Sequence, residues 1–325
     1  MNDILTLAGQ NLLTPMILSF ALGAAAALAR SDLTVPEAAA KTMALYLLFA
    51  IGFKGGVAVS KNGIDGHVLA ALAGGIVLSF LLPFIAFALL RTMSRLSVPE
   101  AAAVSAHYGS ISIVTFATAS AALTSMGIEA EGYMVAVSAA MESPAIISAL
   151  WLAARNGTGT RMDARLWREI LLNGSIVLLI GAFIIGLSTG ADGMAQIAAF
   201  VVAPWLGVLC LFLLDMGLVA GRGLRAARGL IGPALLAFGI VMPLIGAATG
   251  LAMAMLLGLS VGGATLLMVL AASASYIAVP AAMRVALPEA NPAIALTLSL
   301  GITFPFNLTL GIPAYLAVAQ AVIGG

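Results

Sequence analysis

The chain has 325 residues, of which 62% are hydrophobic and only 8% are charged, and its formal net charge is +1. Soluble domains carry about 25% charged residues, so a chain of this composition is expected to fold in a lipid bilayer. The small net charge gives no reason to expect nucleic acid as a partner. A single cysteine, Cys210, excludes a disulfide framework and a cysteine metal cluster.

Ten apolar segments are long enough to cross a bilayer, whose hydrocarbon core of about 30 Å needs about 20 helical residues. The first half contains predicted spans at residues 9–29, 39–59, 67–90, 99–126 and 131–154. The second half contains predicted spans at residues 170–189, 194–220, 230–257, 261–284 and 291–322. Gly190–Gly193 is the predicted link between the sixth and seventh spans. We divide the chain into a first five-helix repeat, residues 1–160, and a second, residues 161–325.

Nearly all basic residues fall on one side of these ten alternating spans. Of the 14 Lys and Arg residues, only Lys54 and Lys61 lie on or toward the other side. The positive-inside rule makes the basic side cytoplasmic and places both termini outside. We therefore expect a multi-pass protein of the bacterial inner membrane with both termini periplasmic or external.

The two halves carry similar features in a similar order. Ile51–Gly56 in the second span resembles Leu214–Leu218 in the seventh, and the fourth and ninth spans both open on Ser-Val and then reach a serine-rich stretch. Because each half has an odd number of spans, the halves must have opposite orientations. Inverted repeats of this kind are typical of secondary transporters. The predicted fold is an all-α membrane protein with two inverted five-helix repeats.

Clusters of small and hydroxyl residues lie at membrane depth in the fourth and ninth spans, at residues 107–115 and 272–280. Gly109 and Pro280 favour a helix break, and the freed backbone groups then need a polar cavity. Two half-helices that begin at such breaks aim N–H groups and positive dipole ends at one point. We predict broken fourth and ninth helices that form a midplane site for a small oxyanion. The alternative is that these small residues only allow close helix contacts.

Three ionisable side chains lie inside predicted spans: Lys54, Glu142 and Asp215. A charge at a helix centre costs roughly 2.5–3.5 kcal/mol, so a functional role is the first hypothesis for each. Glu142 stands before Ser143-Pro144, where the proline frees carbonyl groups one turn earlier, and this favours a cation or a proton. Lys54 and Asp215 occupy near-equivalent repeat positions and either brace other helices or pair with each other.

No pattern in the sequence indicates an enzyme. The two histidines match no zinc motif, no glycine-rich stretch ends in Gly-Lys-Ser/Thr, and the serines have no partner base in a recognisable motif. His107 stands just before the first break. It is either a neutral side chain that hydrogen-bonds a neighbouring helix or a contact for substrate or protons.

On these residues the chain resembles the sodium-dependent bicarbonate transporter (SbtA-type) family of bacterial permeases. The densest similarity covers Ala271–Ser275, Pro280, Arg284, Pro288, Ala290–Pro292, Pro305 and Ile312-Pro313. Further similarity lies at Val35–Ala38, Ile51-Gly52, Gly55-Gly56, Gly109, Ser112, Thr115 and Pro144-Ala145. The resemblance runs through nearly the whole chain, although the long cytoplasmic insert of the family shrinks here to about residues 155–168.

The resemblance implies a ten-helix homotrimer that takes up bicarbonate with Na⁺ by an elevator-like movement. The expected substrate contacts are Gly109, Ser110, Ser112, Thr115, Ser273, Ala274, Ser275 and Tyr276. The expected ion ligands are Glu142, Ser112, Ser273 and Thr303, with Glu142 in the place of a family aspartate. No metal beyond Na⁺ and no cofactor is expected. Some members of the family bind a soluble PII-like regulator on the cytoplasmic face.

Tyr276 stands where the family motif has an aspartate after its serines, which removes a carboxylate ligand for Na⁺. Its hydroxyl either replaces the carboxylate as a weak donor or plugs the site. The leading hypothesis is a secondary transporter for bicarbonate or another small monoanion, coupled to Na⁺ or H⁺. The alternatives are a Na⁺/H⁺-type cation exchanger in which Glu142 titrates, and a non-transporting membrane receptor or scaffold.

Overall fold

The structure, a computed structural model, describes residues 13–63, 65–156, 168, 172, 174–226, 231–277 and 279–324. Within these residues the chain is helical and contains no strand. In the described part of the chain, seven helices are long and apolar enough to cross a membrane: Glu37–Ser60, Gly66–Met93, Met134–Arg155, Gly174–Val201, Trp205–Ala226, Pro233–Leu257 and Pro292–Ile323. The all-α membrane class predicted from the sequence is therefore confirmed.

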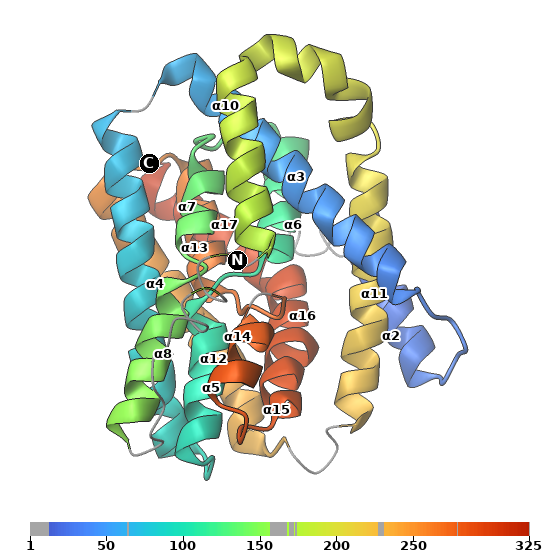
Figure 1. Ribbon diagram of the computed structural model, residues 1–325, viewed down its shortest axis with the longest axis vertical. Coiled ribbons are helices and arrows are strands. Elements are labelled where there is room, and N and C mark those ends of the chain that lie inside the picture. The colour runs from blue at the N-terminus through green and yellow to red at the C-terminus, as the bar shows by residue number, and fades with distance from the viewer. Residues whose placement is uncertain are drawn as a thin grey trace.

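Most helices follow the predicted spans closely (Figure 1). The first half contains α2 (Pro15–Leu28), α3 (Glu37–Asn62), α4 (Gly66–Met93), α5 (Val98–Gly109), α6 (Ile113–Ser125), α7 (Met134–Ala140) and α8 (Pro144–Arg155). The second half begins with α10 (Gly174–Val201), α11 (Trp205–Ala226), α12 (Pro233–Leu257), α13 (Val261–Ala272) and α14 (Val279–Ala286). It ends with α15 (Pro292–Leu296), the π-helical η1 (Thr297–Thr303), α16 (Phe304–Phe306), the π-helical η2 (Asn307–Gly311) and α17 (Ile312–Ile323).

The predicted end of the sixth span at residue 189 agrees with the structure, while the predicted start of the seventh span at residue 194 does not. Gly190 (φ 58°, ψ −144°) has non-helical backbone and divides α10 into two helical segments, the second of which reaches Val201 before α11 begins at Trp205. After the kink, α10 runs across one end of the molecule (Figure 1). A positive φ is a conformation that glycine adopts without strain, so the chain turns here within one residue.

Four helices form a group that we call the frame: α2, α3, α10 and α11. In it α2 packs along α11, and α3 packs along α10. Glycines allow both contacts, because a Cβ on Gly217 would collide with the Phe20 carbonyl and a Cβ on Gly186 would collide with the Phe53 carbonyl. Close approach at small residues is the usual way in which helices associate in lipid, where no hydrophobic force drives them together.

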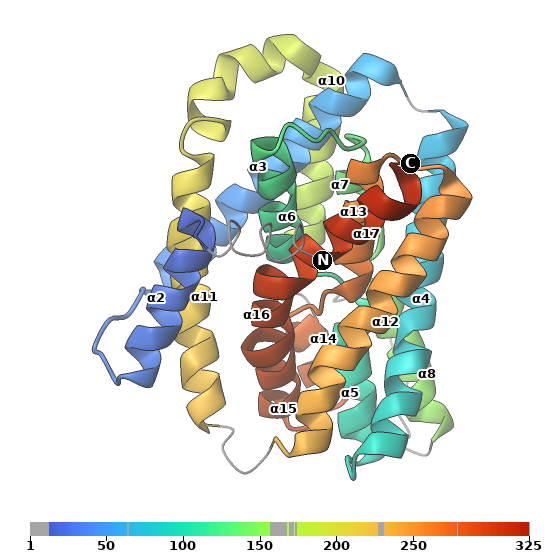
Figure 2. The ribbon, with the colours of Figure 1, turned by 180° about the vertical axis from the view of Figure 1, so that it is seen from behind.

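The remaining helices, α4 to α8 and α12 to α17, form a second group that we call the core bundle. Here α4 packs on α5 and α8, and α12 packs on α13 and α4. Figure 2 shows α12 and α15 to α17 on the face turned away in Figure 1. This group holds both serine-rich stretches, so it contributes most of the candidate site.

The C-terminal ends of α4, α8 and α11 lie at the same end of the molecule (Figure 1). Their last turns carry Arg91, Arg155 and Arg225. This gathering of arginine agrees with the single basic side that the sequence predicts, while Arg161, Arg165 and Arg228 lie outside the described residues. Which face of the membrane this end meets stays a prediction.

Candidate functional site

Both predicted breaks are present, and they lie against each other. Residues 110–112 separate α5 from α6, and residues 273–275 follow α13 without helical structure. The backbone N–H of Ser112 donates to Ser273 Oγ at 2.8 Å, which joins the first break to the second. The structure thus brings together two stretches that lie more than 150 residues apart, as the sequence predicts.

His107 joins the breaks at a second point. The backbone N–H of Ser275 donates to the His107 carbonyl at 2.8 Å, and His107 Nδ1 lies 2.5 Å from the Ser275 carbonyl oxygen. A carbonyl oxygen only accepts hydrogen bonds, so Nδ1 must carry the hydrogen. The His107 side chain is 2% exposed. This geometry fits the hydrogen-bonded histidine among the two roles considered from the sequence.

Ser112 caps the helix that begins at the first break. Its Oγ accepts hydrogen bonds from the backbone N–H of Thr115 at 3.2 Å and from the Thr115 hydroxyl at 2.9 Å. Serine is a preferred N-cap because its oxygen satisfies one of the free N–H groups at the start of a helix. Both contacts use the oxygen as an acceptor, so the hydroxyl hydrogen of Ser112 is left to donate elsewhere.

A small cavity of about 10 Å³ lies where the breaks cross. It is lined by Ile111, Ser112, Ile113, Glu142, Ser175, Ser275, Tyr276 and Ile277. We call it the central cavity. A volume of about 10–15 Å³ accommodates one water molecule, so the central cavity is the size of a single water or ion.

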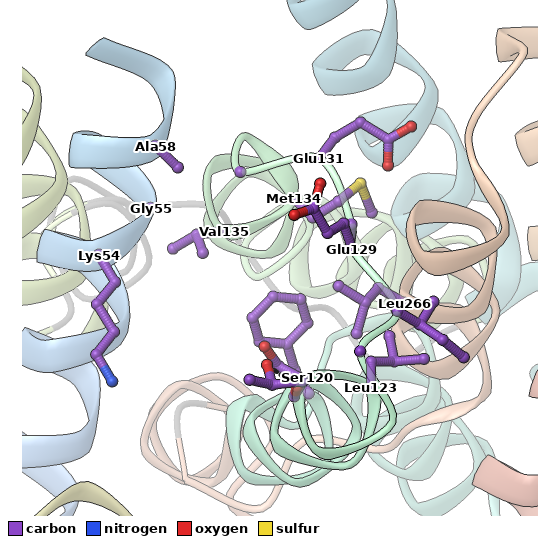
Figure 3. A pocket seen from close by; sticks show the side chains of 16 residues that line it. Lys54, Gly55, Ala58, Ser120, Leu123, Glu129, Glu131, Met134, Val135 and Leu266 are labelled. Carbon is purple, nitrogen blue, oxygen red and sulfur yellow. Dashed lines mark hydrogen bonds between the residues drawn. The ribbon is translucent and has the colours of Figure 1, made fainter. Parts of the chain in front are cut away.

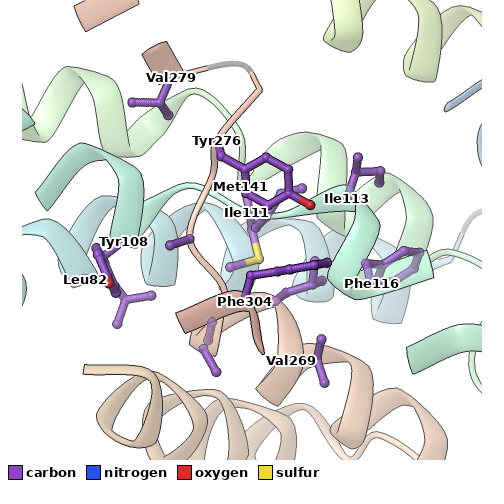
Figure 4. Packing of buried hydrophobic residues seen from close by; sticks show 14 of the residues in the cluster. Leu82, Tyr108, Ile111, Ile113, Phe116, Met141, Val269, Tyr276, Val279 and Phe304 are labelled. Carbon is purple, nitrogen blue, oxygen red and sulfur yellow. The ribbon is translucent and has the colours of Figure 1, made fainter. Parts of the chain in front are cut away.

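Tyr276 contributes the most unusual group of this cavity. Its side chain is only 9% exposed, and its ring packs edge-on against Phe304 at 5.5 Å. In Figure 4 the hydroxyl points toward Ile113, the first residue of α6. It faces Ser112 without the geometry of a hydrogen bond, and in the described part of the chain it is the one buried side-chain polar atom without a partner.

Glu142 belongs to a third break, which the fold prediction of broken fourth and ninth helices did not include. Met141–Ser143 separate α7 from α8. The Ser110 hydroxyl donates to the Glu142 carbonyl at 3.0 Å, and the Ser79 hydroxyl donates to the Met141 carbonyl at 2.6 Å. Pro144 was the sequence signal for this break, because a proline leaves carbonyls of the preceding turn without a donor.

The predicted site residues therefore separate into two sets. Ser112, Ser275, Tyr276 and Glu142 line the central cavity. Gly109, Ser110, Thr115, Ser273 and Ala274 lie in or beside the breaks but do not line it. Gly109 packs against the Pro83 ring, where a Cβ would not fit.

Thr303 lies apart from the central cavity, although it was predicted as an ion ligand. Its hydroxyl donates to the Gly239 carbonyl at 2.7 Å and accepts from the Tyr108 hydroxyl at 2.7 Å. The side chain is fully buried. In this structure Thr303 joins α12, α5 and the end of η1, so its contacts are those of a structural residue.

Sequence reasoning missed two residues that support the second break. Asn307 Nδ2 donates to the carbonyl of Ala272, the last residue of α13, at 2.9 Å. The Tyr315 hydroxyl in turn donates to Asn307 Oδ1 at 2.9 Å. Without Asn307 a helix-end carbonyl at membrane depth would need another donor. A lone asparagine in an apolar span was the available signal.

The two remaining charges do not pair with each other. The Lys54 ammonium lies 4.4 Å from the centre of the Trp205 ring, and no ion pair joins it to Asp215, which is buried on α11. Among the described residues no group of three His, Cys, Asp or Glu side chains is arranged to hold a metal ion.

A family model described as the Na⁺-dependent bicarbonate transporter superfamily matches residues 15–320 of the chain. A search among curated proteins finds no match. The matched range includes every residue of the central cavity.

Proposed function

The chain belongs to the Na⁺-dependent bicarbonate transporter superfamily, and on that premise we propose that it takes up bicarbonate, or a similar small monoanion, together with Na⁺. Na⁺ as the coupling ion agrees with the description of the family. In this proposal the substrate binds at the crossing of the two main breaks, and the protein acts as a secondary transporter, not an enzyme.

The unpartnered hydroxyl of Tyr276 is the observation that carries this proposal. A buried hydroxyl without a hydrogen bond costs about 1–3 kcal/mol in protein interiors. Such groups are rare in native structures, and each calls for an explanation, such as a ligand. Here the hydroxyl lines a cavity with Ser112, Ser275 and Glu142, so a small polar ligand would satisfy it.

The groups at the cavity suit an anion and a cation together. The Ser112 and Tyr276 hydroxyls supply hydrogen-bond donors for an oxyanion, and the start of α6 adds the positive end of its dipole. The Glu142 carboxylate supplies an oxygen ligand of the kind that Na⁺ needs. Tyr276 thus serves as a donor in the position of the family's aspartate, and its ring also fills much of the site.

The size of the central cavity supports movement during transport. At about 10 Å³ it has no room for an anion with four heavy atoms such as bicarbonate. The central cavity, which Ser175 of the frame helix α10 lines together with residues of the core bundle, must therefore widen before the substrate binds. We propose that the core bundle moves against the frame in an elevator-like manner, which gives alternating access from the two sides.

The glycine contacts of the frame support the proposed inverted repeat of ten spans. Gly52 and Gly56 on α3 face α10, and Gly217 and Gly221 on α11 face α2. The second and seventh spans thus present a glycine pair of the same spacing to the sixth and first spans. That exchange of partners is what an inverted five-helix repeat would produce. The homotrimer and the PII-like regulator remain expectations from the family resemblance.

Uptake of radiolabelled bicarbonate into proteoliposomes, with and without an inward Na⁺ gradient, tests the proposal. We expect the gradient to stimulate uptake. Ser112→Ala and Ser275→Ala should each reduce uptake about tenfold or more, as expected for loss of roughly 1.4 kcal/mol of ligand binding. Ser188→Ala is the matched control, because Ser188 is exposed and bonds only its own helix. Unchanged uptake in both site variants would reject the site.

A second candidate function rests on the position of Glu142. Its side chain is 5% exposed and lines the central cavity, so it can exchange a proton for Na⁺ without any anion. A cation exchanger would show Na⁺ flux driven by a pH gradient in bicarbonate-free buffer, and Glu142→Gln would abolish it. Absence of such flux in the wild-type protein excludes this function.

A further inference from the structure

A much larger cavity, of about 500 Å³, lies between the frame and the core bundle (Figure 3). Its walls come from α3, α6, α7, α13 and the loop between α6 and α7. A neighbouring cavity of about 350 Å³ shares Lys54, Phe116, Ser120, Thr124 and Val135 with it. We call the two together the outer cavity, because the sequence predicts that this end of α6 faces outside.

One face of α6 connects the outer cavity to the central cavity. Ile113, at the start of α6, lines the central cavity, while Ser120 lines the outer one. Phe116 lies one turn after Ile113, borders the outer cavity and is only 2% exposed. Residues three and four apart share a helix face, so these three side chains follow one another along α6. Phe116 therefore lies between the two cavities on this face of α6.

Lys54 is the cation on the wall opposite α6. It lies about two turns before the end of α3 at Asn62, and its ammonium is held over the Trp205 ring at 4.4 Å. In Figure 3 the side chain lies across the cavity from Ser120. Of the described residues that line the outer cavity, Lys54 alone is positively charged. A cation in such a low-dielectric recess attracts anions more strongly than the same charge in water.

The carboxylates of this cavity lie in the loop between α6 and α7. Glu131 already accepts two hydrogen bonds from Ser260 at the start of α13. Glu129 is exposed on the same loop. Neither carboxylate forms an ion pair with Lys54, so the ammonium is available to bind an anion.

We propose that Lys54 and the Ser120 hydroxyl form an outer anion site, where a small monoanion binds before it passes Phe116 to the central cavity. This inference rests on the proposed function, because it names the site at which the same substrate enters. The cation belongs to the frame and the hydroxyl to the core bundle. An anion bound here therefore contacts both groups of helices before it moves past Phe116 to the central cavity.

Fluorescence of Trp205 tests the site without any transport. The chain has three tryptophans, and Trp151→Phe with Trp167→Phe leaves Trp205 alone. Iodide, an anionic quencher, should quench Trp205 at least about twofold less in Lys54→Gln, because the local positive potential is lost. Quenching by neutral acrylamide should not change, and bicarbonate should compete with iodide. Lys54→Arg, which keeps the charge, should restore iodide quenching.

Lys41→Gln is the matched control, since Lys41 is exposed near the other end of the same helix. Equal iodide quenching in the parent and in Lys54→Gln would overturn the outer site. So would an equal loss of quenching by iodide and by acrylamide, because that would report a change in exposure of the ring and not in potential.

Bicarbonate uptake supplies the second measurement. Lys54→Gln should raise the KM for bicarbonate about tenfold and leave kcat nearly unchanged, with a smaller difference at high salt, where charges are screened. If the wild-type protein transports no bicarbonate, the proposed function fails while the quenching test still decides the outer site. If the wild-type protein transports and Lys54→Gln has the same KM, the outer site fails and the proposed function stands.

Discussion

Glu131 caps α13 from another part of the chain: its two carboxylate oxygens accept the backbone N–H and the hydroxyl of Ser260, at 2.7 and 2.9 Å. At the start of α5 the capping carboxylate comes from the helix itself, where Glu100 accepts hydrogen bonds from the N–H and the hydroxyl of Ser97. In α13 the position equivalent to Glu100 is Gly263, and a Cβ there would collide with the Glu131 carboxylate. The capping box of α13 is therefore divided between two segments.

Removing the Glu131 carboxylate should destabilise the protein. Glu131→Ala is expected to cost about 1–2 kcal/mol, because the N–H of Ser260 loses a charge-assisted partner at a helix start. Thermal unfolding in detergent measures the loss. Glu129→Ala, a change of the same kind in the same exposed loop, should leave the unfolding temperature unchanged. A similar loss in both variants would show that the loop itself, not the cap, sets stability.

A local capping box should replace the divided one. Gly263→Glu alone should destabilise the protein, since its side chain would occupy the space of the Glu131 carboxylate. In a Glu131→Ala background the same change should recover about 1 kcal/mol, because Ser260 and the new carboxylate would then match Ser97 and Glu100. If the two changes add without any recovery, the proposed equivalence of the caps is wrong.

Removal of the hydroxyl should affect the stability of the protein differently at two buried tyrosines. Tyr276→Phe should leave stability unchanged or raise it, because the hydroxyl has no partner to lose. Tyr108→Phe should cost about 1–3 kcal/mol, since it removes the donor to Thr303. Uptake should fall in Tyr276→Phe even though the fold is intact. Full uptake there would show that the hydroxyl does not touch the substrate.

His107 should stabilise the crossing of the breaks through its Nδ1 hydrogen. His107→Ala leaves the Ser275 carbonyl without this donor and is expected to cost about 2–4 kcal/mol, including the cavity that it opens. His107→Asn retains a donor near the Nδ1 position and should recover part of that loss. Unfolding temperatures of the three proteins decide this, and equal losses in both variants would argue for packing alone.

The frame offers a matched glycine pair on α10. Gly186→Ala should destabilise the protein, because its Cβ would collide with the Phe53 carbonyl of α3. Gly181→Ala meets no atom within 4 Å and should be neutral or stabilising by up to about 1 kcal/mol, as alanine favours helix. Equal unfolding temperatures for the two variants would show that α3 and α10 separate easily.

Hydropathy and serine spacing predicted most of the helices and the meeting of the two breaks, because both leave a local mark on the sequence. The helical segment between Gly190 and Val201 could not be predicted, since Gly190–Gly193 has the composition of a turn whether or not helix continues after it. The third break, at Met141–Ser143, had a signal in Pro144, but proline bends some membrane helices without ending them.

The contacts that complete the site could not be predicted, because they join distant segments. Nothing near Ala272 in the sequence indicates that the Asn307 side chain donates a hydrogen bond to the Ala272 carbonyl. Thr303 was expected as an ion ligand from the family resemblance, and the sequence did not indicate that its hydroxyl bonds to Gly239 and Tyr108. Residue type indicates which hydrogen bonds a side chain can form. The packing of distant segments decides which partner it bonds to.

A glycine lies in close contact with a neighbouring helix at each main break. At the first break the glycine is on α5, where Gly109 packs against the Pro83 ring of α4. At the second break the glycine is on the long helix α12, where Gly246 packs against Ala271 and Ala272 at the end of α13. The glycine thus belongs to the short helix at the first break and to the long helix at the second. Because a Cβ on Gly109 would collide with the Pro83 ring, the damage from Gly109→Ala should be relieved by a smaller residue at position 83 of α4.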